Sequence, residues 1–113
     1  MKRLLLLMSA VLLAVCMNAK TVYSQIGVTE KSGKFIATVD FGDGSKEGYI
    51  LDEKGEKKVF NSVMEVVNYM AARDWKVVDT YVLVANTGHL VYVMAKDVND
   101  DSEIRKDVKT KDV

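Results

Sequence analysis

Residues 60–75 read FNSVMEVVNYMAARDW, and within this stretch the hydrophobic period becomes that of a helix. The apolar residues that recur at i, i+3, i+4, i+7 and i+8, and so form one helix face, are Val63, Val66, Val67, Met70 and Ala71. Ser62 and Glu65 have the spacing of a capping box, and Asn61 is an alternative N-cap. The sequence therefore predicts one amphipathic helix that ends near residues 73–74.

Strands are predicted on the N-terminal side of this helix. Residues 34–41 alternate between two sets of side chains with the period of two that is typical of a strand. A glycine-containing turn at residues 42–45 leads to a second short strand at residues 48–51, which residues 57–60 could resume. We interpret residues 26–33 as a lead-in to the first strand.

Two more strands are predicted on the C-terminal side. Residues 76–85 and 89–96 are rich in β-branched residues, and the Asn-Thr-Gly sequence between them suits a three-residue hairpin loop. The predicted fold is therefore an α+β two-layer sandwich in the order β-β-α-β-β, in which one helix packs on a four-stranded antiparallel sheet. Trp75 follows the helix, and we expect its ring to close that end of the core.

The predicted domain covers residues 25–96. Residues 97–113 are dominated by charged side chains, which are typical of a polar mobile tail. Ile104 and Val108 could hold one short helix within this tail.

The N-terminal residues have the pattern of an export signal. Lys2 and Arg3 precede an apolar run at residues 4–15, which is shorter than the ~20 residues of a membrane-spanning helix. We therefore expect residues 1–24 to be a signal sequence and the protein to be periplasmic or extracellular. The small-residue rule allows cleavage after Ala19 or after Ser24.

Cys16 offers a third way to process the N-terminus. Residues 13–16 resemble the box at which bacterial lipoproteins are lipidated on cysteine, although Val15 stands where those boxes have Gly, Ala or Ser. The alternative hypothesis is therefore a lipoprotein anchored through Cys16. Cleavage after Ala19 or Ser24 would instead remove the single cysteine, and the mature chain could then form no disulfide.

Charge argues against one class of partner. The chain balances 16 basic against 16 acidic residues, whereas a nucleic-acid-binding domain needs a basic stripe. We therefore expect no nucleic-acid partner. No second apolar run follows the signal, so we expect no transmembrane span in the mature chain, and we predict no metal site and no cofactor.

The last two strands are apolar on both faces. A single helix covers only one face of a sheet, and an antiparallel sheet with one solvated face should alternate apolar and polar residues. We therefore hypothesise that the second face is covered by a second copy of the protein, by another partner, or by the N-terminal lead-in.

Two residues could carry chemistry. His89 is the only histidine, and no cysteine stands near it to share a metal ion. Asp79 interrupts an otherwise apolar strand, which is more typical of an edge-facing or hydrogen-bonded aspartate than of a functional carboxylate. A small envelope enzyme or inhibitor that uses Asp79 or His89 is therefore the alternative to a binding function.

The chain resembles a family of small exported proteins of the Bacteroides group. The similar segments lie in order within residues 34–96, and they are Phe60-Asn61-Ser62, Asn68-Tyr69-Met70, Trp75, Val78 and Tyr81. The chain departs from the family at Asp74 and Lys76, where the family has Gly and Glu. The resemblance implies the fold and the compartment, and it implies no activity.

Exposed aromatic residues and their neighbours are the predicted binding residues. Asn68 and Tyr69 are expected on the outer face of the helix, and Tyr81 and Tyr92 on the sheet. The sequence thus favours a non-catalytic exported binding or protein-interaction module, whose partner is another protein or a second copy. A purely structural homodimer is a third hypothesis.

Overall fold

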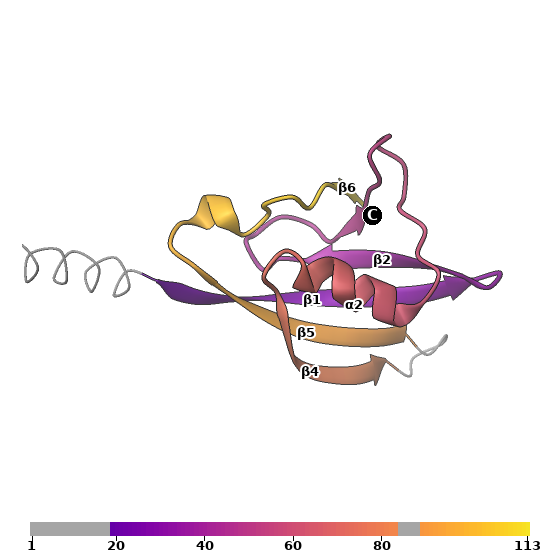
Figure 1. The fold of residues 1–113 in the computed structure, drawn as a ribbon, viewed down its shortest axis with the longest axis horizontal. Coiled ribbons are helices and arrows are strands. Elements are labelled where there is room, and N and C mark those ends of the chain that lie inside the picture. Colours follow the sequence, from indigo (N-terminus) through magenta and orange to yellow (C-terminus); the bar gives the residue numbers. More distant parts are fainter. Residues whose placement is uncertain (1–18, 84–88) are drawn as a thin grey trace, which may run out of the picture.

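The computed structural model describes residues 19–83 and 89–113, without the side chains of Leu83 and His89. These residues form one antiparallel sheet in the order β4-β5-β1-β2-β3-β6 and a short helix, α2 (Figure 1). The elements are β1 (Lys20–Lys31), β2 (Lys34–Asp40), β3 (Gly48–Ile50), α2 (Val63–Ala71), β4 (Lys76–Leu83), β5 (His89–Val98), the 3₁₀ turn η1 (Asp101–Glu103) and β6 (Thr110–Asp112).

The prediction of a four-stranded sheet in the order β-β-α-β-β is wrong. The sheet has six strands, because two segments that were assigned outside it are part of it. Residues 26–33 are no lead-in: β1 is the longest strand and lies at the centre, paired with both β2 and β5. Residues 97–113 complete β5 and supply β6, which pairs with β3.

The sheet has two different faces. The helix α2 packs on one of them, which we call the helix face, and the opposite side is the open face (Figure 1). Alternation along β1 sends Ile26 and Val28 into the core on the helix face, while Tyr23 and Gln25 are exposed on the open face. Residues 25–33 thus cover neither face, since they lie within the sheet or in its β1–β2 turn.

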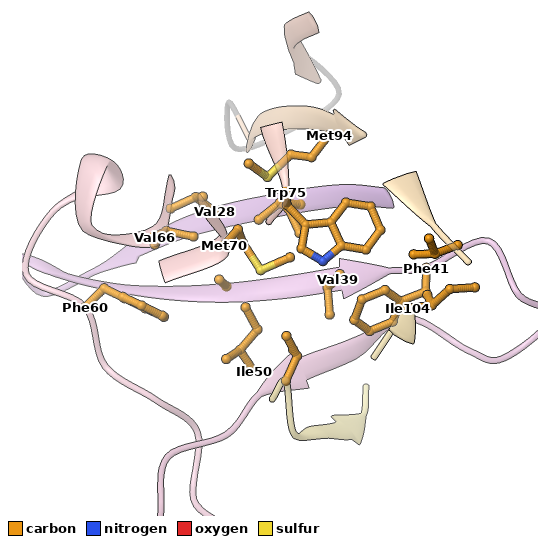
Figure 2. Close-up of a cluster of buried hydrophobic side chains, with 14 residues drawn as sticks. Val28, Val39, Phe41, Ile50, Phe60, Val66, Met70, Trp75, Met94 and Ile104 are labelled. Atoms are coloured by element: carbon orange, nitrogen blue, oxygen red, sulfur yellow. The ribbon is translucent and has the colours of Figure 1, made fainter. Parts of the chain in front are cut away.

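The hydrophobic core lies between α2 and the helix face. Val66 and Met70 are the buried residues of the helix, as the periodicity predicts. Trp75 is only 1% exposed and lies among these side chains, with its ring centroid 6.0 Å from that of Phe41 (Figure 2). Ile104 lies beside Phe41, so the C-terminal segment closes this end of the core (Figure 2).

Both ends of α2 have identifiable caps. Ser62 is the N-cap, and its Oγ accepts a hydrogen bond from the Glu65 N–H at 3.1 Å, which confirms the predicted start. Beyond the last turn, Asp74 has φ = 70°, and the Trp75 N–H donates back to the Met70 carbonyl at 3.2 Å. A residue in this left-handed conformation is usually glycine, because glycine has no Cβ to clash.

Asp74→Gly should therefore stabilise the fold. Glycine at this position would remove the steric cost of the positive φ. We expect a gain of about 0.5–1 kcal/mol in the free energy of unfolding, measured by urea denaturation. Asp74→Ala, which keeps a Cβ, is the matched control and should not stabilise. A loss of stability in Asp74→Gly would contradict this account of the helix end.

No helix within residues 19–83 and 89–113 is long and apolar enough to cross a membrane.

Candidate functional site

The strand β4 is an open edge of the sheet. It pairs with β5 on one side, and no strand of the described chain pairs with its other side. All residues from Lys76 to Val82 are exposed. Four of them are large hydrophobic side chains: Val77 (42% exposed), Val78 (54%), Tyr81 (38%) and Val82 (53%). An edge that is both unpaired and apolar is a template for another β-strand.

A β-bulge distributes these apolar side chains over both faces. The register shifts between Val77 and Asp79, which leaves Val78 as the extra residue. Val77 lies opposite Met94 on the helix face, whereas Tyr81 lies opposite Val91 on the open face. A regular strand would place Val77 and Tyr81 on the same face, and the bulge is what separates them. A strand that docked against β4 would meet apolar side chains above and below its backbone.

The opposite edge of the sheet is protected. β6 has only three residues, and Lys111 and Asp112 are exposed there. Short, charged edge strands resist pairing with another chain. The contrast between the two edges singles out β4.

The open face also carries a shallow groove of about 580 Å³. Val91 and Ile36 form part of its lining, and Thr38 donates a hydrogen bond from Oγ1 to Glu47 Oε1 at 2.6 Å. A Cβ at Gly27 would lie 2.9 Å from that Thr38 Oγ1, so glycine permits the close approach. The groove mixes apolar and polar groups, and this face of β1 and β2 is more polar than that of β5.

A second groove, of about 540 Å³, lies beside the end of α2 and includes the predicted binding residue Tyr69. The Arg73 guanidinium lies 3.5 Å from the Tyr69 ring centroid. Its Nε donates to the Asp107 carbonyl at 2.7 Å, and its Nη1 donates to the Tyr69 carbonyl at 2.8 Å. Burial raises the pKa of the Tyr69 hydroxyl. These contacts hold the C-terminal segment against the helix. The residues that line this groove therefore have a structural role.

Arg105 makes a similar tether at the other end of the segment. Its guanidinium pairs with Asp43 at 2.9 Å, hydrogen-bonds Ser45, and lies 4.7 Å from the Phe41 ring centroid. The hydrogen bond from Arg105 holds the pKa of the Asp43 carboxyl well below its usual range. The cluster joins the C-terminal segment to the β2–β3 turn.

The comparisons with known proteins assign neither a family nor a function to this chain. No family model, curated protein or solved structure matches the chain. The resemblance to the Bacteroides family therefore stays a prediction, and the function has to be argued from the residues of this chain.

The four predicted binding residues do not form one site. Asn68 is exposed on α2, while Tyr69 is half-buried in the groove described above. Tyr92 is half-buried against the core on the helix face, and Tyr81 is exposed on the open face of β4. Only Tyr81 belongs to the open edge. The apolar residues on both faces of the last hairpin led to the hypothesis of a covered second face, and they did not indicate that the edge of β4 is open.

Of the residues that were predicted to carry chemistry or lipidation, the structure describes the side chain of Asp79 alone. Asp79 is exposed on β4, and its carboxylate accepts a hydrogen bond from the Thr80 N–H at 2.8 Å. The His89 side chain and Cys16 lie outside what the structure describes. Among the described residues, no three His, Cys, Asp or Glu side chains are grouped as metal ligands would be.

Proposed function

We propose that this chain is an exported, non-catalytic protein-interaction module that binds an extended segment of a partner along the free edge of β4. The observation that carries this proposal is the run from Lys76 to Val82, which is exposed, largely apolar and unpaired on its outer side in the described structure. Such an edge offers backbone N–H and C=O groups for a new strand, and its side chains give the strand apolar contacts.

The chemistry of β4 indicates the kind of segment that it would bind. Lys76 and Asp79 are its only charged residues, and they have opposite signs. The edge therefore has no net charge to attract a strongly acidic or basic ligand. It fits a strand with β-branched or aromatic residues, which would pack against Val78 and Val82 while pairing with the backbone.

Export is supported by the N-terminal sequence. A basic start and the apolar run at residues 4–15 are followed by Ala19, a small residue that suits cleavage. We therefore propose that the module acts in the bacterial envelope or outside the cell.

Site-specific photo-crosslinking tests the proposed edge. A photoreactive amino acid is placed at Val78 or at Val59 in the full chain, in cells that make the protein naturally. Val59 is 53% exposed, against 54% for Val78, but it lies in the loop before α2, so it is a matched control. We expect a covalent adduct of defined mass from position 78 and none from position 59.

A second substitution makes this test specific. With the photoreactive group at Tyr81, Val78→Lys should suppress the adduct, because a lysine on an edge strand opposes pairing. Val59→Lys should leave the adduct unchanged. The adduct mass also separates a different protein from a second copy, which is the homodimer hypothesis. Absence of an adduct at positions 78 and 81, or equal adducts at positions 78 and 59, would contradict binding at β4.

A further inference from the structure

The start of β1 bears on where the export signal is removed. The sequence allows cleavage after Ala19 or Ser24, or lipidation at Cys16. These possibilities leave different amounts of chain before Gln25. The fold argues against cleavage after Ser24, because residues 20–24 belong to a central strand.

The first five residues of β1 are paired along their whole length. Lys20 lies opposite Val98 of β5, and the register continues without interruption to Ser24 opposite Met94. Side chains reinforce this pairing. Lys20 Nζ lies 2.5 Å from Asp101 Oδ1, and the Thr21 Oγ1–H donates to Asp97 Oδ1 at 2.7 Å.

These residues also contribute to the core. Ser24 is only 3% exposed on the helix face, and Val22 packs against the buried cluster on the same side. Lys96 is buried opposite Val22, and its Nζ donates to the Glu103 carbonyl at 2.6 Å. Residues 20–24 are therefore part of the folded domain.

A chain that began at Gln25 would leave the end of β5 without a partner. β4 pairs with β5 only as far as Ala95, so residues 96–98 pair with residues 20–22 and with no other strand of the described chain. Val98 is 1% exposed, and it would lose its neighbour Lys20 on the β1 side. Cleavage after Ser24 would thus remove five paired residues from the centre of the sheet.

The boundary of β1 coincides with the other cleavage position. Ala19 is exposed and outside the strand, and Lys20 is the first paired residue. A chain processed at Cys16 would also keep β1 whole. Val15, directly before Cys16, stands where a lipoprotein box has Gly, Ala or Ser. The residue directly before the Ala19–Lys20 bond is small, as the rule requires, although Met17 stands where the rule has a second small residue.

We propose that the export signal is removed between Ala19 and Lys20, so that the mature protein begins with the first residue of β1. This inference rests on the export proposed above. Water hydrolyses the Ala19–Lys20 peptide bond in the active site of a membrane-bound signal peptidase. The products are a carboxyl group on Ala19 and a free α-amino group on Lys20.

The N-terminus of the exported protein tests this site. The full chain is expressed in a bacterium, and the exported fraction is analysed by intact mass and N-terminal sequencing. We expect one species that begins at Lys20. A chain that begins at Gln25, or at an acylated Cys16, would overturn the cleavage site and leave export intact. A chain that keeps Met1 and remains in the cytoplasm would overturn both proposals.

Matched variants keep the result interpretable. Ala19→Leu breaks the small-residue rule at the proposed site and should cause the precursor to accumulate. Ser24→Val breaks the same rule at the other site and should still give a chain that begins at Lys20. Because the readout is the N-terminal sequence, it remains valid if β1 packs less well in Ser24→Val. Normal processing of Ala19→Leu, or failure of Ser24→Val to be processed, would contradict the proposal.

Discussion

Removal of residues 101–113 should leave a chain that does not fold cooperatively. This segment buries Ile104 and Val108 in the core and supplies β6 as the partner of β3. Burial of these two side chains contributes about 1.5–3 kcal/mol each, and the stability of a small domain is about 5–15 kcal/mol in total. The truncation also removes Arg105 and its contacts with Asp43 and the Phe41 ring.

Circular dichroism during urea denaturation is the measurement for this prediction. We expect the complete chain to show a single transition and the truncated chain to show none. Ile104→Ala gives a graded version, with an expected loss of about 3 kcal/mol. Lys106→Ala is the matched control, because Lys106 is exposed two residues away and should change stability by less than about 0.5 kcal/mol. A truncated chain as stable as the complete one would show that the segment does not pack on the core.

Trp75→Ala should strongly destabilise the fold. Trp75 is among the largest fully buried side chains, and it contacts Phe41 while Lys96 Nζ lies 5.8 Å from its ring. Replacing a buried Trp by Ala costs about 3–5 kcal/mol, because the surrounding side chains fill the cavity only in part.

The midpoint of urea denaturation at an unchanged slope measures this loss. Trp75→Phe keeps an aromatic ring next to Phe41. Its loss in the free energy of unfolding should be less than half of the loss in Trp75→Ala. Since Trp75 is the only tryptophan, circular dichroism has to replace fluorescence as the probe. A loss below about 1 kcal/mol in Trp75→Ala would contradict the position of Trp75 in the core.

The helix could be predicted because its signals are local. The periodicity of residues 63–71 and the cap at Ser62 both lie within one short stretch, and the structure has the helix at these residues. The turn at residues 42–45 and the strand before it are also where the sequence indicates them.

The central position of β1 could not be read from the same kind of pattern. Val22, Ile26 and Val28 do alternate, but Ser24 interrupts the apolar set on the buried face. The alternation also begins before residue 25, where the domain was expected to start. Because residues 1–24 were expected to be a signal sequence, the rest of this strand resembled a short lead-in.

The role of residues 97–113 depends on contacts that are distant in sequence. β6 reads Thr110–Asp112 and has no apolar side chain, so only its backbone pairing with β3 makes it a strand. Ile104 and Val108 belong to the same buried cluster as core residues that precede residue 99 in the sequence. Composition alone therefore resembles that of a mobile tail.

The candidate site was visible in part. The apolar residues of the last hairpin led to the hypothesis of a covered second face, whereas in the structure the exposed apolar residues lie on the edge strand β4. The bulge at Val78 has no clear local signal, because Val77 and Val78 are equally suited to a regular strand. The faces on which Val77 and Tyr81 lie could therefore not be assigned from sequence.

Amide hydrogen exchange of the chain from residue 20 onward, measured residue by residue by NMR at low concentration, tests the central claim most directly. That claim is a sheet with β1 at its centre and β4 as an open edge among the described strands. We expect slow exchange throughout Thr21–Val28 and fast exchange of the β4 amides that point away from β5. Fast exchange at residues 21–24, or slow exchange of every β4 amide in the monomer, would contradict it.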